Sequence, residues 1–334
     1  GTLLPNTFFA IRAQASDGEA VVRVLEGPIQ PPHDLSHGYH PWSAAGLPRL
    51  AEATLRGEYP FATIDFSDPD LPVQVRLEAW TPLIPLNPED SGLPCAVLTY
   101  TVTNSAPEAV SLTIVGSLFN PVGGVAFDPF GNIAAVGTGL NVNEFREEEA
   151  LRGLFLHGKQ YGAGSLLYGD MSLTTGHPKG HADVTVKRAW LRGAWYDFLQ
   201  EFWDDFSSDG LLDDLGYDSP SPMGKSDTGS LGLLDKLAPG ESKAYRFLLT
   251  WFFPNRTNSW DNQPDAPLVR NNYAARFDSS WDVARYLVQQ MPRLEGETRR
   301  FHAALFDSTL PPAVLDAVSA NIVPLRSPTC FWLE

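Results

Sequence analysis

The feature that most constrains the fold is an alternation of apolar and polar residues with a period of two, which runs from Thr7 to about Thr250. In the stretch "VQVRLEAW" the apolar side chains occupy every second position, whereas Trp80 falls on the opposite face. Clusters of Asn, Asp, Gly and Pro separate such stretches, as between Ser67 and Pro72. Because side chains alternate across a strand, the pattern predicts half-buried strands joined by short turns. Such strands are typical of antiparallel sheets that pack face to face.

One amphipathic helix is predicted among the strands, in the stretch "GAWYDFLQEFWDDFSSDG". Its apolar residues recur at spacings of three and four: Trp195, Phe198, Leu199, Phe202, Trp203 and Phe206. This spacing places them on one face of a helix. We expect the helix to end near Asp209 and Gly210.

After Pro254 the apolar period lengthens to that of helices. The first stripe comprises Phe277, Trp281, Ala284, Val288 and Met291. Pro292 is expected to break this helix, and a similar stripe then follows: Leu294, Thr298, Phe301 and Leu305. A further helix is predicted to begin at Pro312 and to stop at Pro324. Its apolar face comprises Val314, Val318 and Ile322.

These patterns predict a mainly β fold, a two-sheet antiparallel β-sandwich with an inserted amphipathic helix, followed by C-terminal helices. We assign residues 1–270 to the sandwich and residues 271–334 to the helical section. The helical section has too few elements to close a bundle of its own. We therefore expect its helices to lean on the sandwich.

The composition narrows the classes of partner and of site. Forty acidic residues against 24 basic ones give a formal net charge of −16, which argues against nucleic acid and anionic membranes as partners. Cys95 and Cys330 are the only cysteines, so we expect no disulfide framework and no Cys-based zinc site. No apolar run approaches the ~18 residues of a membrane span. No signal peptide is visible, so a cytoplasmic location is the simplest expectation.

Several stretches resemble the N-terminal domain of glycoside hydrolase family 116, the family of bile-acid β-glucosidase, or non-lysosomal glucosylceramidase. They include "LPNTFFAIRA", "FWDDFSSDGLL", "WFFPNR", "WDVARYL" and "STLPPAVLDAVSANIVPLRSPTC". The most specific is the Pro-spaced stretch from Gly57 to Asn104, because its prolines, acids and strand alternation match together. The resemblance covers nearly the whole chain.

The resemblance implies a sandwich joined to a C-terminal (α/α)6 barrel that carries out catalysis. The helix expected from Pro312 to Val323 resembles the entry to that barrel, so we expect the chain to be a domain-sized part of a longer protein, with further sequence beyond both of its ends.

In the family the two catalytic carboxyl groups, which a retaining glucosidase holds about 5 Å apart, lie in the barrel. No position here matches their motifs. We therefore assign no catalytic residue, no metal and no cofactor, leave the substrate-binding residues open, and expect the chain to be inactive alone. The expected partner is the barrel of the same polypeptide, and β-glucosides such as glucosylceramide would bind only there.

Two histidine clusters are candidate metal sites. His33, His37 and His40 have spacings that would suit one helix face, but the Pro and Gly residues among them disfavour a helix. A polar loop is the simpler interpretation. The pair His177 and His181, in the turn "GHPKGH", is a weaker candidate.

An acidic stretch partly matches a calcium-binding loop. Asp205, Ser207, Asp209 and Asp213 occupy the first, third, fifth and ninth positions of such a loop, and Gly210 occupies the sixth, where the loop turns sharply. The twelfth position is Gly216 where a bidentate Glu is required, which excludes an EF-hand. A looser calcium site between Asp205 and Asp218 stays open, against the alternative of a solvated acidic helix end.

Trp80 raises an alternative function for the whole chain. It lies opposite the apolar face of its strand and could contact a sugar or the barrel, whereas four other tryptophans fall on predicted core faces: Trp195, Trp203, Trp251 and Trp281. The alternatives to a non-catalytic glucosidase domain are therefore a stand-alone carbohydrate-binding β-sandwich module and a calcium-stabilised sandwich. A part of a larger enzyme should expose an apolar surface near the C-terminal helices.

Overall fold

The computed structural model describes residues 4–29, 46–124, 126–127, 133–134, 137–193, 197–258, 266–326 and 330–333. Within these residues two large antiparallel sheets dominate the fold. The smaller sheet has the strand order β13-β14-β7-β1-β2, and the larger has the order β10-β11-β12-β15-β6-β5-β4-β3. The chain is thus mainly β, as the period-two pattern predicts.

The smaller sheet is formed by β1 (Phe8–Ala15), β2 (Val21–Val24), β7 (Val110–Phe119), β13 (Asp183–Lys187) and β14 (Thr228–Leu237). The larger sheet is formed by β3 (Glu52–Glu58), β4 (Phe61–Ser67), β5 (Val73–Trp80), β6 (Cys95–Asn104), β10 (Asn141–Glu147), β11 (Arg152–Gly158), β12 (Asp170–Thr175) and β15 (Ser242–Phe252). Two short hairpins pair β8 (Ala126–Phe127) with β9 (Ile133–Ala134) and β16 (Asn255–Arg256) with β17 (Val269–Arg270).

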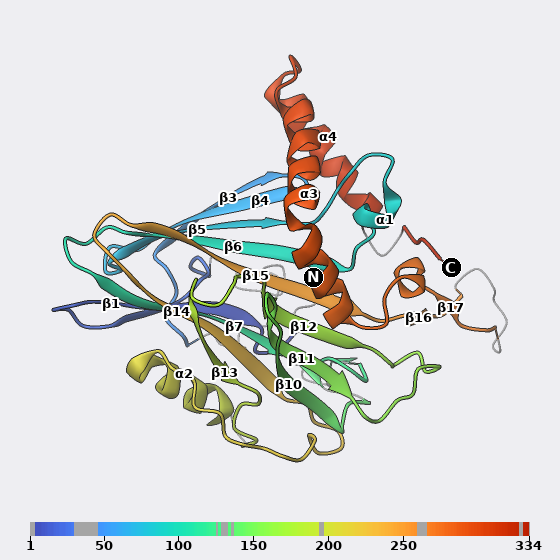
Figure 1. The fold of residues 1–334 in the computed structure, drawn as a ribbon, viewed down its shortest axis with the longest axis horizontal. Helices are drawn as coiled ribbons and strands as arrows, with labels where there is room; N and C mark the ends of the chain where they lie inside the picture. Colours follow the sequence, from blue (N-terminus) through green and yellow to red (C-terminus); the bar gives the residue numbers. More distant parts are fainter. Residues whose placement is uncertain are drawn as a thin grey trace.

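The helical elements are α1 (Pro88–Ser91), α2 (Asp197–Asp209), α3 (Ser280–Phe306) and α4 (Pro312–Ile322), with 3-10 turns η2 (Asn272–Ala275) and η3 (Val323–Arg326). α2 packs on the outer face of the smaller sheet and α3 on the outer face of the larger one, so the two helices lie on opposite sides of the sandwich (Figure 1). The molecule therefore has four layers: helix, sheet, sheet, helix.

The central core lies between the two sheets and is built by the alternation seen in the sequence. Ile11 of β1 and Ile114 of β7, which are direct partners across their strands, face Val75 of β5 and Val102 of β6. Each of the four is at most 3% exposed. Burial of such a side chain contributes about 1.5–3 kcal/mol, so this shared core fixes the two sheets face to face.

The long helix α3 corrects one expectation. Pro292 does not break it: the helix runs from Ser280 to Phe306 with Pro292 inside. A Pro within a helix costs about 3 kcal/mol, but the buried side chains on both sides of it offset that cost. Those side chains are Trp281, Val283, Ala284, Leu287, Met291 and Leu294, which pack on the larger sheet.

The amphipathic helix α2 is confirmed where the stripe predicts it. Phe202 and Phe206 are fully buried against Phe8 and Val115 of the smaller sheet. The helix ends at Asp209, and Gly210 follows with a φ of 83°. Glycine adopts this left-handed conformation without steric cost, which makes it the usual residue after a helix end. Trp195 lies outside the described residues.

Candidate functional site

The helix α4 is held to the sandwich by only one of its faces. Leu315 and Ser319, four residues apart, are 7% and 2% exposed. The hydroxyl of Ser319 accepts a hydrogen bond of 2.8 Å from the backbone N–H of Tyr59, in the turn between β3 and β4. Just beyond, Arg326 of η3 donates to the Thr81 hydroxyl at 2.8 Å and to the Leu93 carbonyl at 3.0 Å. These contacts fix the middle of α4 and the end of η3 beside the larger sheet.

The remaining surface of this segment is apolar and exposed. We define the apolar surface of α4 as five residues, with exposed fractions from 38% to 63%: Leu310, Val314, Val318, Val323 and Leu325. Val314 and Val318 are spaced by four and so share one side of the helix, and Leu310 lies two residues before it. Asp316 is the only charged residue of α4. The sequence predicts an apolar face that includes Val314 and Val318. The structure leaves these two side chains in solvent and buries Leu315 against the sandwich instead.

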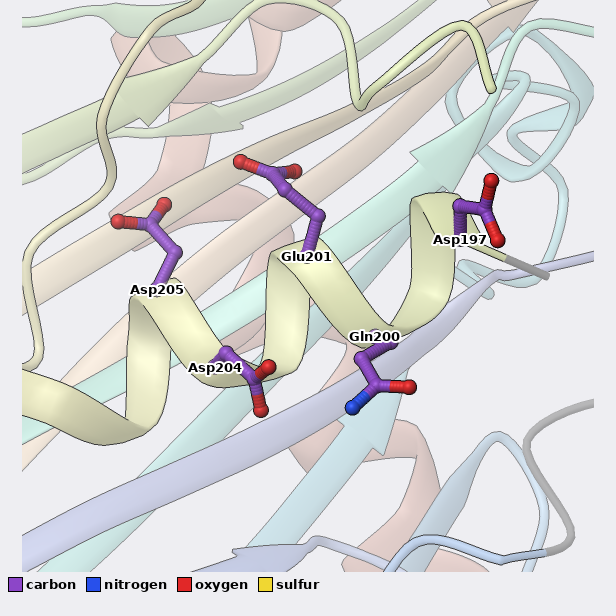
Figure 2. Close-up of a pocket in the computed structure, with 5 residues that line it drawn as sticks. All are labelled: Asp197, Gln200, Glu201, Asp204 and Asp205. Carbon is purple, nitrogen blue, oxygen red and sulfur yellow. The ribbon is translucent and has the colours of Figure 1, made fainter. Parts of the chain in front are cut away.

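The acidic stretch after α2 is organised around a lysine. Lys187 of β13 is fully buried, and its ammonium donates to Glu201 Oε1 at 2.7 Å, to Asp205 Oδ2 at 2.9 Å and to the Asp213 carbonyl at 2.7 Å. Figure 2 shows Glu201 and Asp205 projecting from the same side of α2, whereas Asp204 and Gln200 project from another. The three N–H groups of an ammonium are thereby all satisfied.

The cation between Glu201 and Asp205 is the Lys187 ammonium, which offsets one of their two negative charges. A calcium ion at these two carboxylates would have to displace it, which disfavours the looser calcium site between Asp205 and Asp218. Burial by itself lowers the pKa of Lys187, but the hydrogen bonds to Glu201 and Asp205 outweigh burial and raise the pKa above its ordinary value. No group of three or more His, Cys, Asp or Glu side chains in the described part of the chain is arranged to hold a metal ion.

The pair His177 and His181 has a structural role. Their rings stack with centroids 3.8 Å apart. His177 Nε2 accepts a hydrogen bond of 2.8 Å from the backbone N–H of Arg246, and His181 Nε2 lies 2.8 Å from the carbonyl of Ala244. Both partners belong to β15, beyond the last residue that pairs with β12. The two side chains thus replace a neighbouring strand, and burial lowers the pKa of His177 to about 3. His33, His37 and His40 lie outside the described residues.

Trp80 does not form a sugar platform. It lies on the face of β5 opposite Val73 and Val75, as predicted, but it is only 4% exposed. Its ring lies 5.9 Å from that of Phe61, in the core that α3 covers. The period-two pattern correctly predicted the face of β5 on which Trp80 lies. It could not show that a helix 200 residues later would cover that face.

Two buried acids were not recognised from the sequence. Asp170, at the start of β12, accepts a hydrogen bond of 2.6 Å from the backbone N–H of Ser280 at the start of α3. Burial raises the pKa of Asp170 to about 6. Asp90 instead binds Arg293 Nη1 at 2.8 Å and the Tyr286 hydroxyl at 2.7 Å. Both acids bind groups of α3, so they fix that helix on the sandwich.

Both cysteines are free thiols: Cys95 is buried and Cys330 is exposed. Burial raises the pKa of the Cys95 thiol to about 12, which keeps it protonated and unreactive. Among the described residues, no helix has both the length and the apolar character needed to cross a membrane.

Comparison with solved structures finds distant similarity. A putative kojibiose phosphorylase from human microbiome is 9% identical over 89% of this chain and 27% of its own, with a TM-score of 0.35. A polysaccharide lyase is 12% identical over 75% and 26%, with a TM-score of 0.34. The GH36 α-galactosidase AgaA from Geobacillus stearothermophilus is 9% identical over 73% and 30%, with a TM-score of 0.29. The chain spans between about a quarter and a third of the length of these proteins.

A comparison with protein families gives a match over most of the chain. Residues 2–294 match the family described as "beta-glucosidase 2, glycosyl-hydrolase family 116 N-term". The match includes both sheets, α2 and the first half of α3. The chain therefore belongs to glycosyl-hydrolase family 116, as its N-terminal domain.

Proposed function

We propose that this chain is a non-catalytic β-sandwich domain that docks onto the helical catalytic portion of a retaining β-glucosidase through the apolar surface of α4. One observation carries the proposal: a domain of this family presents five apolar side chains to solvent on a segment that is anchored from its other side. Exposed apolar residues that cluster in this way are typical of interaction sites.

The composition of α4 favours a helical, apolar partner. The helix has one charged residue, and its exposed positions include small side chains, Ala313 and Ala317, beside Val314 and Val318. Small and branched apolar residues let a second helix approach closely and interdigitate. A hydrophilic partner would leave these side chains without contacts, so the proposed occupant is a helix of the (α/α)6 barrel in the same polypeptide.

The proposed reaction of the whole enzyme is hydrolysis, with retention, of β-glucosides such as glucosylceramide. The family description names a β-glucosidase, which supports the reaction class. Retention requires a nucleophilic carboxylate and an acid/base carboxyl about 5 Å apart. We place both in the helical portion, as the family resemblance implies, because no residue of this chain matches their motifs. The buried acids Asp90 and Asp170 bind groups of α3 instead.

The test is an assay of the pure 334-residue chain with p-nitrophenyl β-D-glucoside. We expect no release of p-nitrophenol above the buffer rate, in a sample whose cooperative thermal unfolding shows that it is folded. Adding the separately produced helical portion should restore turnover. Turnover by the chain alone that persists after repeated purification would overturn the proposal.

A second function, saccharide binding by the sandwich itself, is favoured by a different feature. That feature is a pocket beside Trp190 on the smaller sheet, far from the buried Trp80.

A further inference from the structure

A pocket of about 320 Å³ opens where the central strands of the smaller sheet end. Its wall includes Phe119, the last residue of β7, and Thr228, the first residue of β14, which are direct partners across the two strands. Asn6, just before β1, and the segment after β13 complete it. Small-molecule sites typically have volumes of about 300–1,000 Å³, apolar walls and a few polar groups that fix the ligand. The pocket fits that description.

The apolar wall of the pocket is rigid. Trp190 stacks on Phe202 of α2 with centroids 4.2 Å apart and planes 13° apart. Its indole N–H donates to the Ser230 hydroxyl at 2.8 Å. Phe198, also of α2, lies against the same indole with centroids 6.5 Å and planes 29° apart, and it lines the pocket itself. Because each ring is held by its neighbours, the wall needs no reorganisation when a ligand binds.

An ion pair supplies the polar side of the pocket. Arg192 donates to Asp227 through Nε at 3.0 Å and through Nη2 at 2.7 Å. The same guanidinium donates to Ser219 and lies over the ring of Tyr217, with 4.4 Å from Cζ to the centroid. The side chains of Arg192 and Asp227 are 18% and 6% exposed. The pair is therefore fixed and electrically neutral.

The ion pair still has hydrogen-bonding capacity. A guanidinium has five N–H donors and a carboxylate has about four acceptor positions. The contacts to Asp227 and Ser219 use four of the donors, and Arg192 uses two of the acceptor positions. One donor and two acceptor positions are left, which suits a hydroxyl group because a hydroxyl both donates and accepts.

Two further polar groups at this pocket have no partner among the residues that the structure describes. The side-chain amide of Asn6 makes no hydrogen bond there, and Asn6 has a φ of 53°, in the left-handed region. The ammonium of Lys225 is exposed and forms no ion pair there. Asparagine is one of the few non-glycine residues that adopt this conformation readily, and Asn6 lines the pocket.

We propose that this pocket binds one pyranose ring of a neutral saccharide. A pyranose presents C–H groups on its faces and hydroxyls at its edge, which match the aromatic wall and the groups of Arg192, Asp227 and Asn6. A purely apolar ligand would leave these buried polar groups without partners, which costs affinity. A charged ligand gains little from the Arg192–Asp227 pair, which is already neutral, or from the Lys225 ammonium, which is exposed and therefore screened by water. The inference rests on the second function proposed above and gives it a ligand class. It is independent of the docking function, because the pocket lies on the smaller sheet and α4 on the larger.

The test is fluorine NMR on the 334-residue chain labelled with fluorotryptophan, in which Trp190→Phe identifies the Trp190 resonance. Titration with methyl β-D-glucopyranoside should shift that resonance and saturate in the millimolar range, while the Trp80 resonance stays in place. Cyclohexanol, which has a six-membered ring but one hydroxyl, should cause no saturable shift.

Variants identify the polar contacts. Asn6→Gly removes the amide and keeps a residue that adopts positive φ, so binding should weaken about fivefold, the loss typical of one hydrogen bond. Lys225→Ala should weaken it by a similar factor. Lys236→Ala, the same change at the exposed far end of β14, should leave binding unchanged.

Three results would overturn the inference. The first is a Trp190 resonance that does not move, the second is equal affinity in Asn6→Gly, and the third is tighter binding of methyl β-D-glucuronide than of the neutral glucoside. Each of these outcomes would leave the docking proposal intact, because none involves α4.

Discussion

At the scale of single residues, Lys187 shows how the fold supplies a cation where the sequence suggested a metal. Its ammonium contacts two carboxylates of α2 and one carbonyl of the following loop. A buried charge requires partners of opposite sign, and here the Lys187 ammonium of β13 offsets one of the two α2 carboxylates that it contacts. The link joins the edge strand of the smaller sheet to the helix that covers that sheet.

Replacing Lys187 by Met should destabilise the fold by about 3–5 kcal/mol, the cost typical of removing one partner from a buried ion pair. Glu201 and Asp205 would then repel each other at 26% and 14% exposure. Lys236→Met, at an exposed site, should change stability by less than about 0.5 kcal/mol. Urea denaturation measures both. In the wild type, excess EDTA should leave the melting temperature unchanged, and a lower value in EDTA would mean that a metal ion is bound.

The second prediction at this scale concerns pH. The pKa of His177 is lowered to about 3 in the folded chain, mainly by burial, against about 6.5 when unfolded. Between these values the unfolded chain binds a proton that the folded chain does not. Stability should therefore fall as the pH decreases from about 6.5 toward 3, by on the order of 2 kcal/mol after allowance for partial exposure.

His177→Gln tests this effect, because the Gln side chain can still accept from the Arg246 N–H but does not titrate. Its free energy of unfolding, measured in urea between pH 7 and pH 4, should depend less on pH than that of the wild type. Equal pH dependence in the two proteins would rule His177 out as the source. Asp170 acts in the opposite sense, since its raised pKa favours the protonated folded form, so the comparison must be made within this pair of proteins.

What could be predicted at the residue scale was the type of each side chain and its local pattern. The acids from Asp205 to Asp213 were recognised as a cluster, but Lys187 was not recognised as its cation. It lies 18 residues before Asp205 and on another element. Similarly, Asn6, Arg192 and Asp227 carry no sequence motif, and only the fold brings them to one pocket.

At the scale of elements, α3 shows why local rules fail when packing is extensive. Pro292 predicts a break, yet eight buried residues hold the helix on the larger sheet. The sequence predicts the apolar stripes of α3 both before and after Pro292. Only the predicted break of the helix at Pro292 is wrong. The same packing determines the environment of Trp80, which the period-two pattern placed on the correct face of β5.

A prediction follows for that interface. Trp80→Ala should destabilise the chain by about 3–5 kcal/mol, the cost of a large cavity in a core, because Trp80 is 4% exposed beneath α3. Trp332→Ala makes the same change at a side chain that is 43% exposed, and should cost less than about 1 kcal/mol. Chemical denaturation compares the two. Similar costs would show that α3 does not cover Trp80 as described.

At the scale of the whole molecule, the sequence predicts two sheets but not the order of their strands. β14 pairs with β7 across more than 100 residues, and β1 lies between β2 and β7. Such pairings depend on contacts distant in sequence, which alternation alone does not specify. The assignment of residues 1–270 and 271–334 to separate sections stays a prediction. α3 shares a core with the larger sheet, so the sandwich and this helix are packed together.

The most direct measurement of the docking proposal is calorimetric titration of this chain against the separately produced helical portion of the enzyme. Val314→Asp places a charge at the centre of the apolar surface of α4, whereas Leu166→Asp makes a comparable change at a residue of similar exposure, 46% against 42%, in the loop before β12. We predict that Val314→Asp weakens binding at least about tenfold, equivalent to about 1.4 kcal/mol, and that Leu166→Asp binds as the wild type does. Wild-type affinity in Val314→Asp would contradict the proposal.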